Sequence, residues 1–136
     1  MKCNEVILAH LRIEYSAGLE KKVDLNSVCK KLSDVMVKTK IFPVGGIRVR
    51  AFRADDFSIA DKHNRNLFCD LVLRMGEGRA EEERIRAGEE LISGAKEIFN
   101  ELLESQYFAL SLEVIEINSA FSWKINSIHT RLNAKG

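Results

Sequence analysis

The stretch IFPVGGIRVR at residues 41–50 shows how this chain is organised, because it holds the end of one element and the start of the next. Pro43 is the single proline of the chain, and a helix usually ends before such a residue. The glycine pair after it permits a turn, and the following residues alternate between apolar and basic side chains, as in a half-buried strand. This stretch therefore predicts a helix, a turn and a strand in immediate succession.

The residues before this stretch complete one strand-helix-strand unit. Apolar and polar side chains alternate over residues 9–15, which predicts a first strand. Apolar residues then recur at helical spacing over residues 25–36, and Asp24 or Asn26 is the expected N-cap. A helix of this length can cross over the sheet, so its two flanking strands are expected to be parallel.

The residues after this stretch repeat the pattern. Residues 55–65 are polar and predict a loop, and residues 67–75 alternate as a third strand. The clearest helical stripe covers residues 80–105, a fourth strand follows at residues 108–114, and residues 123–132 show a weaker strand pattern. The expected architecture is α/β (α+β), with two β-α-β units forming a four-stranded sheet and two helices on one face. The other face would carry apolar residues too, so oligomerisation is expected to cover it.

The composition narrows the class of protein. The chain has 136 residues, 46% of them hydrophobic and 30% charged, which suits one globular domain. A net charge of +1 gives no indication of nucleic acid or of an anionic membrane as partner. Three widely spaced cysteines without a CxxC motif argue against a disulfide framework and a zinc site. No stretch suits a membrane span or a signal peptide, so a cytoplasmic protein is predicted.

An ordered set of motifs resembles the 5-carboxymethyl-2-hydroxymuconate isomerase family of the tautomerase superfamily. Residues 41–50 are similar to the family's central signature, and residues 75–79 (MGEGR) resemble its Gly-x-Gly-Arg turn. Residues 109–113 (ALSLE) are similar to the strand after the second helix, residues 126–129 (NSIH) to the C-terminal stretch, and residues 10–16 (HLRIEYS) to the opening of the mature chain.

This resemblance divides the chain into an N-terminal extension, residues 1–8, and a single tautomerase-like domain, residues 9–136. It implies a homotrimer with three active sites at subunit boundaries and no cofactor. In the family, a proline exposed by loss of the initiator methionine moves a proton between carbons of an unsaturated keto diacid, in aromatic catabolism. Arginines hold the substrate carboxylates.

Two arginines of this chain match the family's carboxylate-binding positions, namely Arg48 and Arg79. Arginine suits this role because it is permanently charged and can bind a carboxylate through two parallel hydrogen bonds. The alternative for either residue is an ordinary surface ion pair, which for Arg79 would form with one of the acids at residues 81–83.

The family's first residue falls on Ala9, so the catalytic proline is absent. A terminal amine has a pKa of about 7.7–8.0, which burial and nearby cations can lower towards neutral pH, where a general base works best. A peptide nitrogen accepts no proton. His10 and Met1 are the candidates for a replacement base, although a histidine on the polar side of a strand can also be a solvated or interface residue.

Three functions remain open at this point. The first is an isomerase of an unsaturated dicarboxylate or keto/enol acid that uses another base. The second is a silent family member that binds a small dicarboxylate through Arg48 and Arg79. The third is a trimeric interaction protein whose N-terminal extension fills the old pocket or pairs with a sheet edge. Because Ala9 replaces the proline, weak or no activity by the family mechanism is predicted.

Overall fold

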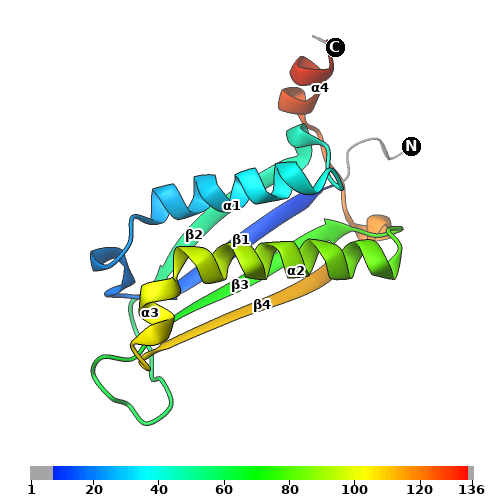
Figure 1. Cartoon of the computed structure of the whole chain (residues 1–136). Helices are drawn as coiled ribbons and strands as arrows, with labels where there is room; N and C mark the ends of the chain where they lie inside the picture. Colours follow the sequence, from blue (N-terminus) through cyan, green and yellow to red (C-terminus); the bar gives the residue numbers. More distant parts are fainter. Residues whose placement is uncertain (1–7, 135–136) are drawn as a thin grey trace.

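A four-stranded sheet with two long helices on one face makes up most of the computed structural model, which describes residues 8–134 (Figure 1). The strands are β1 (Ala9–Ser16), β2 (Ile47–Ala54), β3 (Leu67–Gly76) and β4 (Phe108–Ile117). The helices are α1 (Leu25–Thr39), α2 (Glu81–Ile98), α3 (Asn100–Glu104) and α4 (Ser127–Ala134). Three single 3-10 turns are η1 (Leu19–Lys21), η2 (Val44–Gly46) and η3 (Ser119–Phe121). The two predicted β-α-β units are confirmed. No helix within residues 8–134 is long and apolar enough to cross a membrane.

The sheet has the strand order β2-β1-β3-β4. The pairs β1·β2 and β3·β4 are parallel, because a crossover helix joins the strands of each pair, and the two units meet through the antiparallel pair β1·β3. Ala9 lies opposite Ile47 on one side and Met75 on the other. The starts of β1 and β2 and the ends of β3 and β4 therefore share one end of the sheet, which we call the Ala9 end.

Alternate residues of the strands form the core with α1 and α2. On this helix-covered face the strand side chains are almost fully buried in the two central strands, namely Ala9, Leu11, Ile13, Cys69, Leu71, Leu73 and Met75. The helices contribute the periodic apolar residues that the sequence predicted, including Val28, Leu32, Met36, Leu91 and Ala95. The predicted N-cap of α1 is Asp24, whose carboxylate accepts a hydrogen bond from the Asn26 N–H at 3.0 Å.

Two predictions about the second half of the chain were wrong. The helix expected at residues 80–105 is interrupted at Phe99, where the backbone bends and the buried ring packs 5.1 Å from the ring of Phe108. The weak strand expected at residues 123–132 instead becomes α4 from Ser127 onwards. The Asn126 side chain accepts from the His129 N–H at 3.0 Å, which satisfies an unpaired helical donor as an N-cap does.

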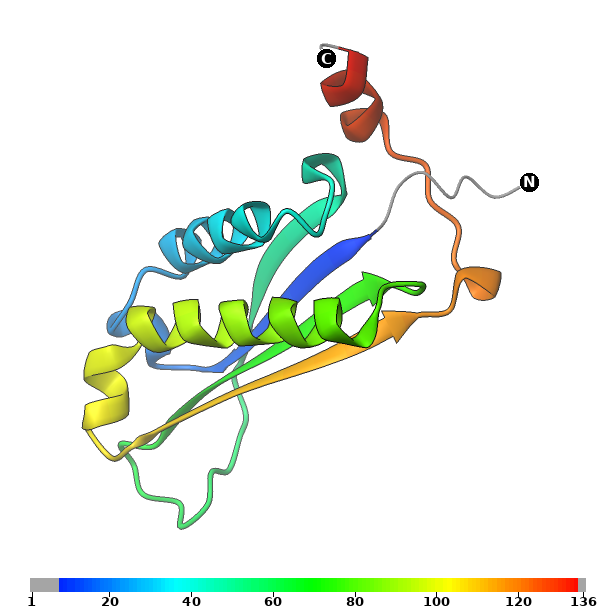
Figure 2. The same cartoon turned by 45° about the vertical axis from the view of Figure 1, so that its right-hand side comes forward.

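The second face of the sheet, which we call the open face, carries no helix (Figure 2). The apolar residues Phe52, Phe68 and Val72 lie on it, as predicted from their spacing. Basic side chains occupy its Ala9 end, however, so the face is less apolar than the sequence pattern suggested. The apolar sequence of residues 6–8 also favours a continuation of β1. Residues 6 and 7 lie outside the described part, and the Leu8 carbonyl accepts from the Gly76 N–H at 3.0 Å.

Candidate functional site

Ala9 stands at the first position of β1, with its side chain fully buried against the helices. Its nitrogen is joined to Leu8 in a peptide bond, and the Leu8 carbonyl extends the ladder to β3 by accepting from Gly76. Ala9 begins the strand, as the alternation over residues 9–15 predicts. Its nitrogen is an amide, which has no lone pair free to take a proton at neutral pH.

His10, the next residue, faces the other way, towards the open face. It lies opposite Arg48 of β2 and Arg74 of β3, and it is only 6% exposed. Its Nε2 atom is buried and has no hydrogen-bond partner among residues 8–134. Burial, followed by the charges of Arg48, Arg50 and Arg74, lowers the pKa of His10 to about 4. The imidazole is therefore neutral at pH 7 and holds a proton only weakly.

Arg48 and Arg79 both lie at the Ala9 end of the sheet, Arg48 on β2 and Arg79 in the connection between β3 and α2. Arg48 is an exposed residue at the start of β2 and shares the open face with its partner His10. Arg79 lies between β3 and α2, beside the helix that covers the opposite face. The ion pair that was the alternative role for Arg79 is present but long, since Arg79 Nη1 lies 3.7 Å from Glu83 Oε2. Its Nε is buried without a partner among residues 8–134.

A group of basic side chains surrounds Arg48. We call it the open-face basic cluster; its members are His10, Arg12, Arg48, Arg50 and Arg74. Burial, together with the neighbouring charges of the cluster, lowers the pKa of Arg50. Only His10 and Arg48 were picked out from the sequence. The alternation within each strand indicates that all five side chains point to the same face as His10. Only the strand order and register show that they lie next to one another.

The segment of residues 118–126, which we call the C-terminal strap, crosses the Ala9 end between β4 and α4 (Figures 1 and 2). One end is held by Glu77, whose carboxylate accepts from the Ser119 N–H at 2.9 Å. The other end is held where Asn126 donates its side-chain N–H to the Gly45 carbonyl at 2.7 Å. Between these points the strap presents large side chains to solvent, and Ile125 is 99% exposed.

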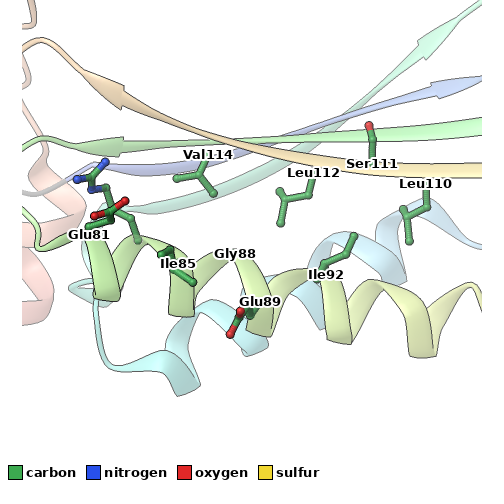
Figure 3. Close-up of a pocket in the computed structure, with 10 residues that line it drawn as sticks. Glu81, Ile85, Gly88, Glu89, Ile92, Leu110, Ser111, Leu112 and Val114 are labelled. Atoms are coloured by element: carbon green, nitrogen blue, oxygen red, sulfur yellow. The ribbon is translucent and has the colours of Figure 1, made fainter.

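An open groove of about 670 Å³ lies elsewhere, between α2 and the edge strand β4 (Figure 3). Its apolar lining comes from both elements, namely Ile85, Ile92, Leu110, Leu112 and Val114. At one end Arg84 pairs with Glu116 at 3.3 Å. None of the site residues predicted from the sequence lines this groove, so the candidate site stays at the Ala9 end.

The comparisons with known proteins agree on one family. A family model described as 5-carboxymethyl-2-hydroxymuconate isomerase matches residues 9–132. The 5-carboxymethyl-2-hydroxymuconate Delta-isomerase of Escherichia coli is 33% identical over 122 residues, which cover 90% of this chain and 97% of that protein. This chain belongs to the 5-carboxymethyl-2-hydroxymuconate isomerase family.

Solved structures of the 5-carboxymethyl-2-hydroxymuconate isomerase family share the same fold. The isomerase from Deinococcus radiodurans has a TM-score of 0.85 at 34% identity, over 91% of this chain and 93% of that one. A second crystal structure, of a delta-isomerase, has a TM-score of 0.84 at 30% identity, over 92% and 93% of the two chains. A fused 4-OT protein described as a symmetric trimer is 15% identical with a TM-score of 0.54, which shows a shared fold alone.

Proposed function

We propose that this member of the isomerase family binds an unsaturated dicarboxylate, or a related keto/enol acid, at the Ala9 end of its sheet and lacks the amine base that fast proton transfer needs. The observation that carries the proposal is the state of Ala9. Its nitrogen is an amide within the chain, and the preceding Leu8 carbonyl is hydrogen-bonded to Gly76, so no amine stands at that position.

His10 is a poor replacement for the missing base. Its pKa of about 4 leaves the imidazole neutral at pH 7, but a base this weak gives little driving force for taking a proton from carbon. Its Nε2 is also buried on the open face, whereas Ala9 faces the helices. Loss of a general base typically lowers a rate by roughly 10²–10⁴-fold. We therefore expect weak or no turnover from the chain in its natural form.

The two arginines supply the binding part of the proposal. Arg79 precedes α2, where the free N–H groups of the first turn also favour an anion. Its long contact to Glu83 leaves the guanidinium incompletely paired, and such a group can exchange one carboxylate for another at small energetic cost. Arg48 is exposed at the same end of the sheet and can hold a second carboxylate.

A homotrimer is part of the same proposal. The open face, the exposed apolar side chains of the C-terminal strap and the groove beside β4 are surfaces that subunit contacts would cover. Light scattering coupled to size exclusion, at micromolar concentration, is expected to give three times the chain mass of 15.4 kDa. A clean monomer would contradict this part of the proposal.

The binding site is tested by calorimetric titration with short dicarboxylates. We expect weak binding that disappears in Arg79→Ala and persists in the matched control Arg53→Ala, whose guanidinium pairs with Asp55 at the far end of β2. Binding that is unchanged in both Arg48→Ala and Arg79→Ala would return these arginines to the role of surface residues.

The second candidate is a trimeric protein that binds a small dicarboxylate, or another protein, without catalysis. Ala9 favours it, since a chain without the base keeps the arginines but not the proton transfer. An assay of enol–keto conversion of phenylenolpyruvate separates the two candidates, because only an isomerase gives saturable turnover. Saturable turnover at a high rate by the full-length chain that survives mutation of His10 would contradict the proposed loss of the base.

A further inference from the structure

The open-face basic cluster brings several positive charges together within a short distance. In the strand register His10 lies between Arg48 and Arg74, and Arg12 lies opposite Arg50. Side chains directly opposite one another on paired strands have Cβ atoms about 5 Å apart. Four guanidinium groups and one imidazole thus occupy two neighbouring rows of the sheet.

No carboxylate within residues 8–134 forms an ion pair with this cluster. The four ion pairs in that part of the chain use other arginines, namely Arg53, Arg79, Arg84 and Arg86. Among the acids of the open face, Glu14 and Asp70 stand opposite each other in the next row, and Asp70 accepts a hydrogen bond from the Ser111 hydroxyl at 2.7 Å. Glu113 lies in the row of Arg12, but Val72 of β3 stands between them. The cluster therefore holds repelling charges without a counter-ion from its own chain.

His10 adds an independent observation that points to a ligand. Its side chain is more than nine-tenths buried within the cluster, yet its Nε2 has no hydrogen-bond partner within residues 8–134. Leaving a buried polar atom unpaired costs roughly 1–3 kcal/mol, so such atoms usually have a partner in the working protein. An anion seated between the arginines would supply an oxygen to a neutral imidazole that carries its proton on Nε2.

We propose that the open-face basic cluster is an anion site of its own, which takes a compact multivalent oxyanion such as inorganic phosphate or a small polycarboxylate. Arg48, Arg50 and Arg74 would bind the oxygens through charge-assisted hydrogen bonds, and His10 would complete the shell as a neutral donor. The site goes beyond the proposed function, because it excludes Arg79 and shares with that function only Arg48. The bound anion offsets the repulsion among the arginines and so lets a second copy of the chain cover this face.

The test uses the full-length protein and inorganic phosphate as the probe, with chloride at equal ionic strength as the reference. The variants are Arg50→Gln and Arg74→Gln, and the matched control is Arg53→Gln on β2, outside the cluster. Phosphate is expected to raise the melting temperature of the natural chain and of the control by several degrees. In each cluster variant calorimetry should show at least a tenfold weaker phosphate affinity.

The melting temperature in chloride supplies a second readout. If the cluster has no partner in the absence of an anion, removing one repelling charge should make Arg50→Gln and Arg74→Gln melt at a higher temperature than the natural chain. Variants that melt lower in chloride, with no response to phosphate in the natural chain, would show that carboxylates of a second copy neutralise the cluster, which overturns the proposal. Phosphate binding that is lost in Arg79→Ala but kept in Arg74→Gln would overturn it as well, by assigning the anion to the other site. The proposed function is judged separately, by dicarboxylate binding to Arg79.

Discussion

The two faces of the sheet are made by the same four strands but have opposite character. On the helix-covered face, the residues of the central strands are apolar and fully buried, as Leu11 and Leu73 illustrate. On the open face, the intervening positions carry arginines, acids and the buried His10. One face is complete within a single chain, whereas the other has arginines without an ion pair and a buried nitrogen without a hydrogen-bond partner in residues 8–134. The difference indicates that the open face works together with a ligand or another subunit.

The largest effect is expected from the helix-covered face. Leu73→Ala should lower the free energy of unfolding by about 3 kcal/mol, because it leaves a cavity at a fully buried position. Val72→Ala, one residue away on the open face, should lower it less than Leu73→Ala does, because Val72 is only half-buried within its own chain. Urea unfolding measures both. Equal losses would mean that the open face is packed as tightly as the core, which contradicts the comparison.

The next effect concerns pH and the open face. The folded protein keeps the pKa of His10 at about 4, below the ordinary value of 6.5, so the unfolded chain binds the proton first. The natural chain should therefore lose stability as the pH falls from about 6.5 towards 4, and about 2 kcal/mol of this loss should be present at pH 5. At pH 7.5 both states hold a neutral imidazole, and this contribution vanishes.

The matched variant for this effect is His10→Asn, which keeps a polar side chain but does not titrate. Unfolding free energies of both proteins are measured at pH 7.5 and pH 5, and the difference between the two proteins isolates His10 from the carboxylates that titrate below pH 5. A natural chain that loses no more stability than His10→Asn would show that His10 is not held in a positively charged, desolvated place.

A smaller effect is expected where the C-terminal strap joins the body of the protein. A Cβ atom at Gly45 would lie 2.6 Å from the His129 Cα, so Gly45→Ala should separate α4 from η2 and cost about 1–2 kcal/mol. Gly88→Ala is the control, because its Cβ would meet only the side chains of Val114 and Leu112 on β4 at ordinary distances and should stabilise α2 by roughly 0.5–1 kcal/mol. Hydrogen exchange of residues 127–134 checks the detachment. Unchanged protection in Gly45→Ala would show that the strap is not anchored there.

The helix-covered face could be predicted from the sequence, and the open face only in part. The alternation over residues 9–15 and the helical spacing of apolar residues indicate which side chains are buried. This is because side chains return to the same face every second residue in a strand and about every 3.6 residues in a helix. The interruption at Phe99 was missed because the residue is apolar and suits the helical stripe, and only packing against Phe108 shows the bend. The sequence did not predict α4, because the helix begins with a local hydrogen bond from the His129 N–H to the Asn126 side chain. The spacing of apolar residues does not indicate such a cap.

The candidate site divides in the same way. The replacement of proline by Ala9 is visible in the sequence, because the resemblance to the family puts its first residue at position 9. The grouping of Arg12, Arg50 and Arg74 around His10 is not visible in the sequence, because these residues come from three separate strands. Strand order and register bring them together. The placement of Arg48 and Arg79 at the same end of the sheet likewise depends on the strand order and on the β3–α2 connection.

The most direct measurement restores the base. A chain that lacks residues 1–8 and carries Ala9→Pro behind an initiator methionine should lose that methionine and expose a secondary amine at the start of β1, next to His10. We predict a gain of at least about 10²-fold in enol–keto conversion of phenylenolpyruvate over the natural chain, and loss of this gain when Arg79→Ala is added. Mass spectrometry confirms the exposed proline, and light scattering confirms the assembly. A folded, correctly processed trimer that shows no gain would contradict the account, because it would mean that the binding site itself, and not only the base, is missing.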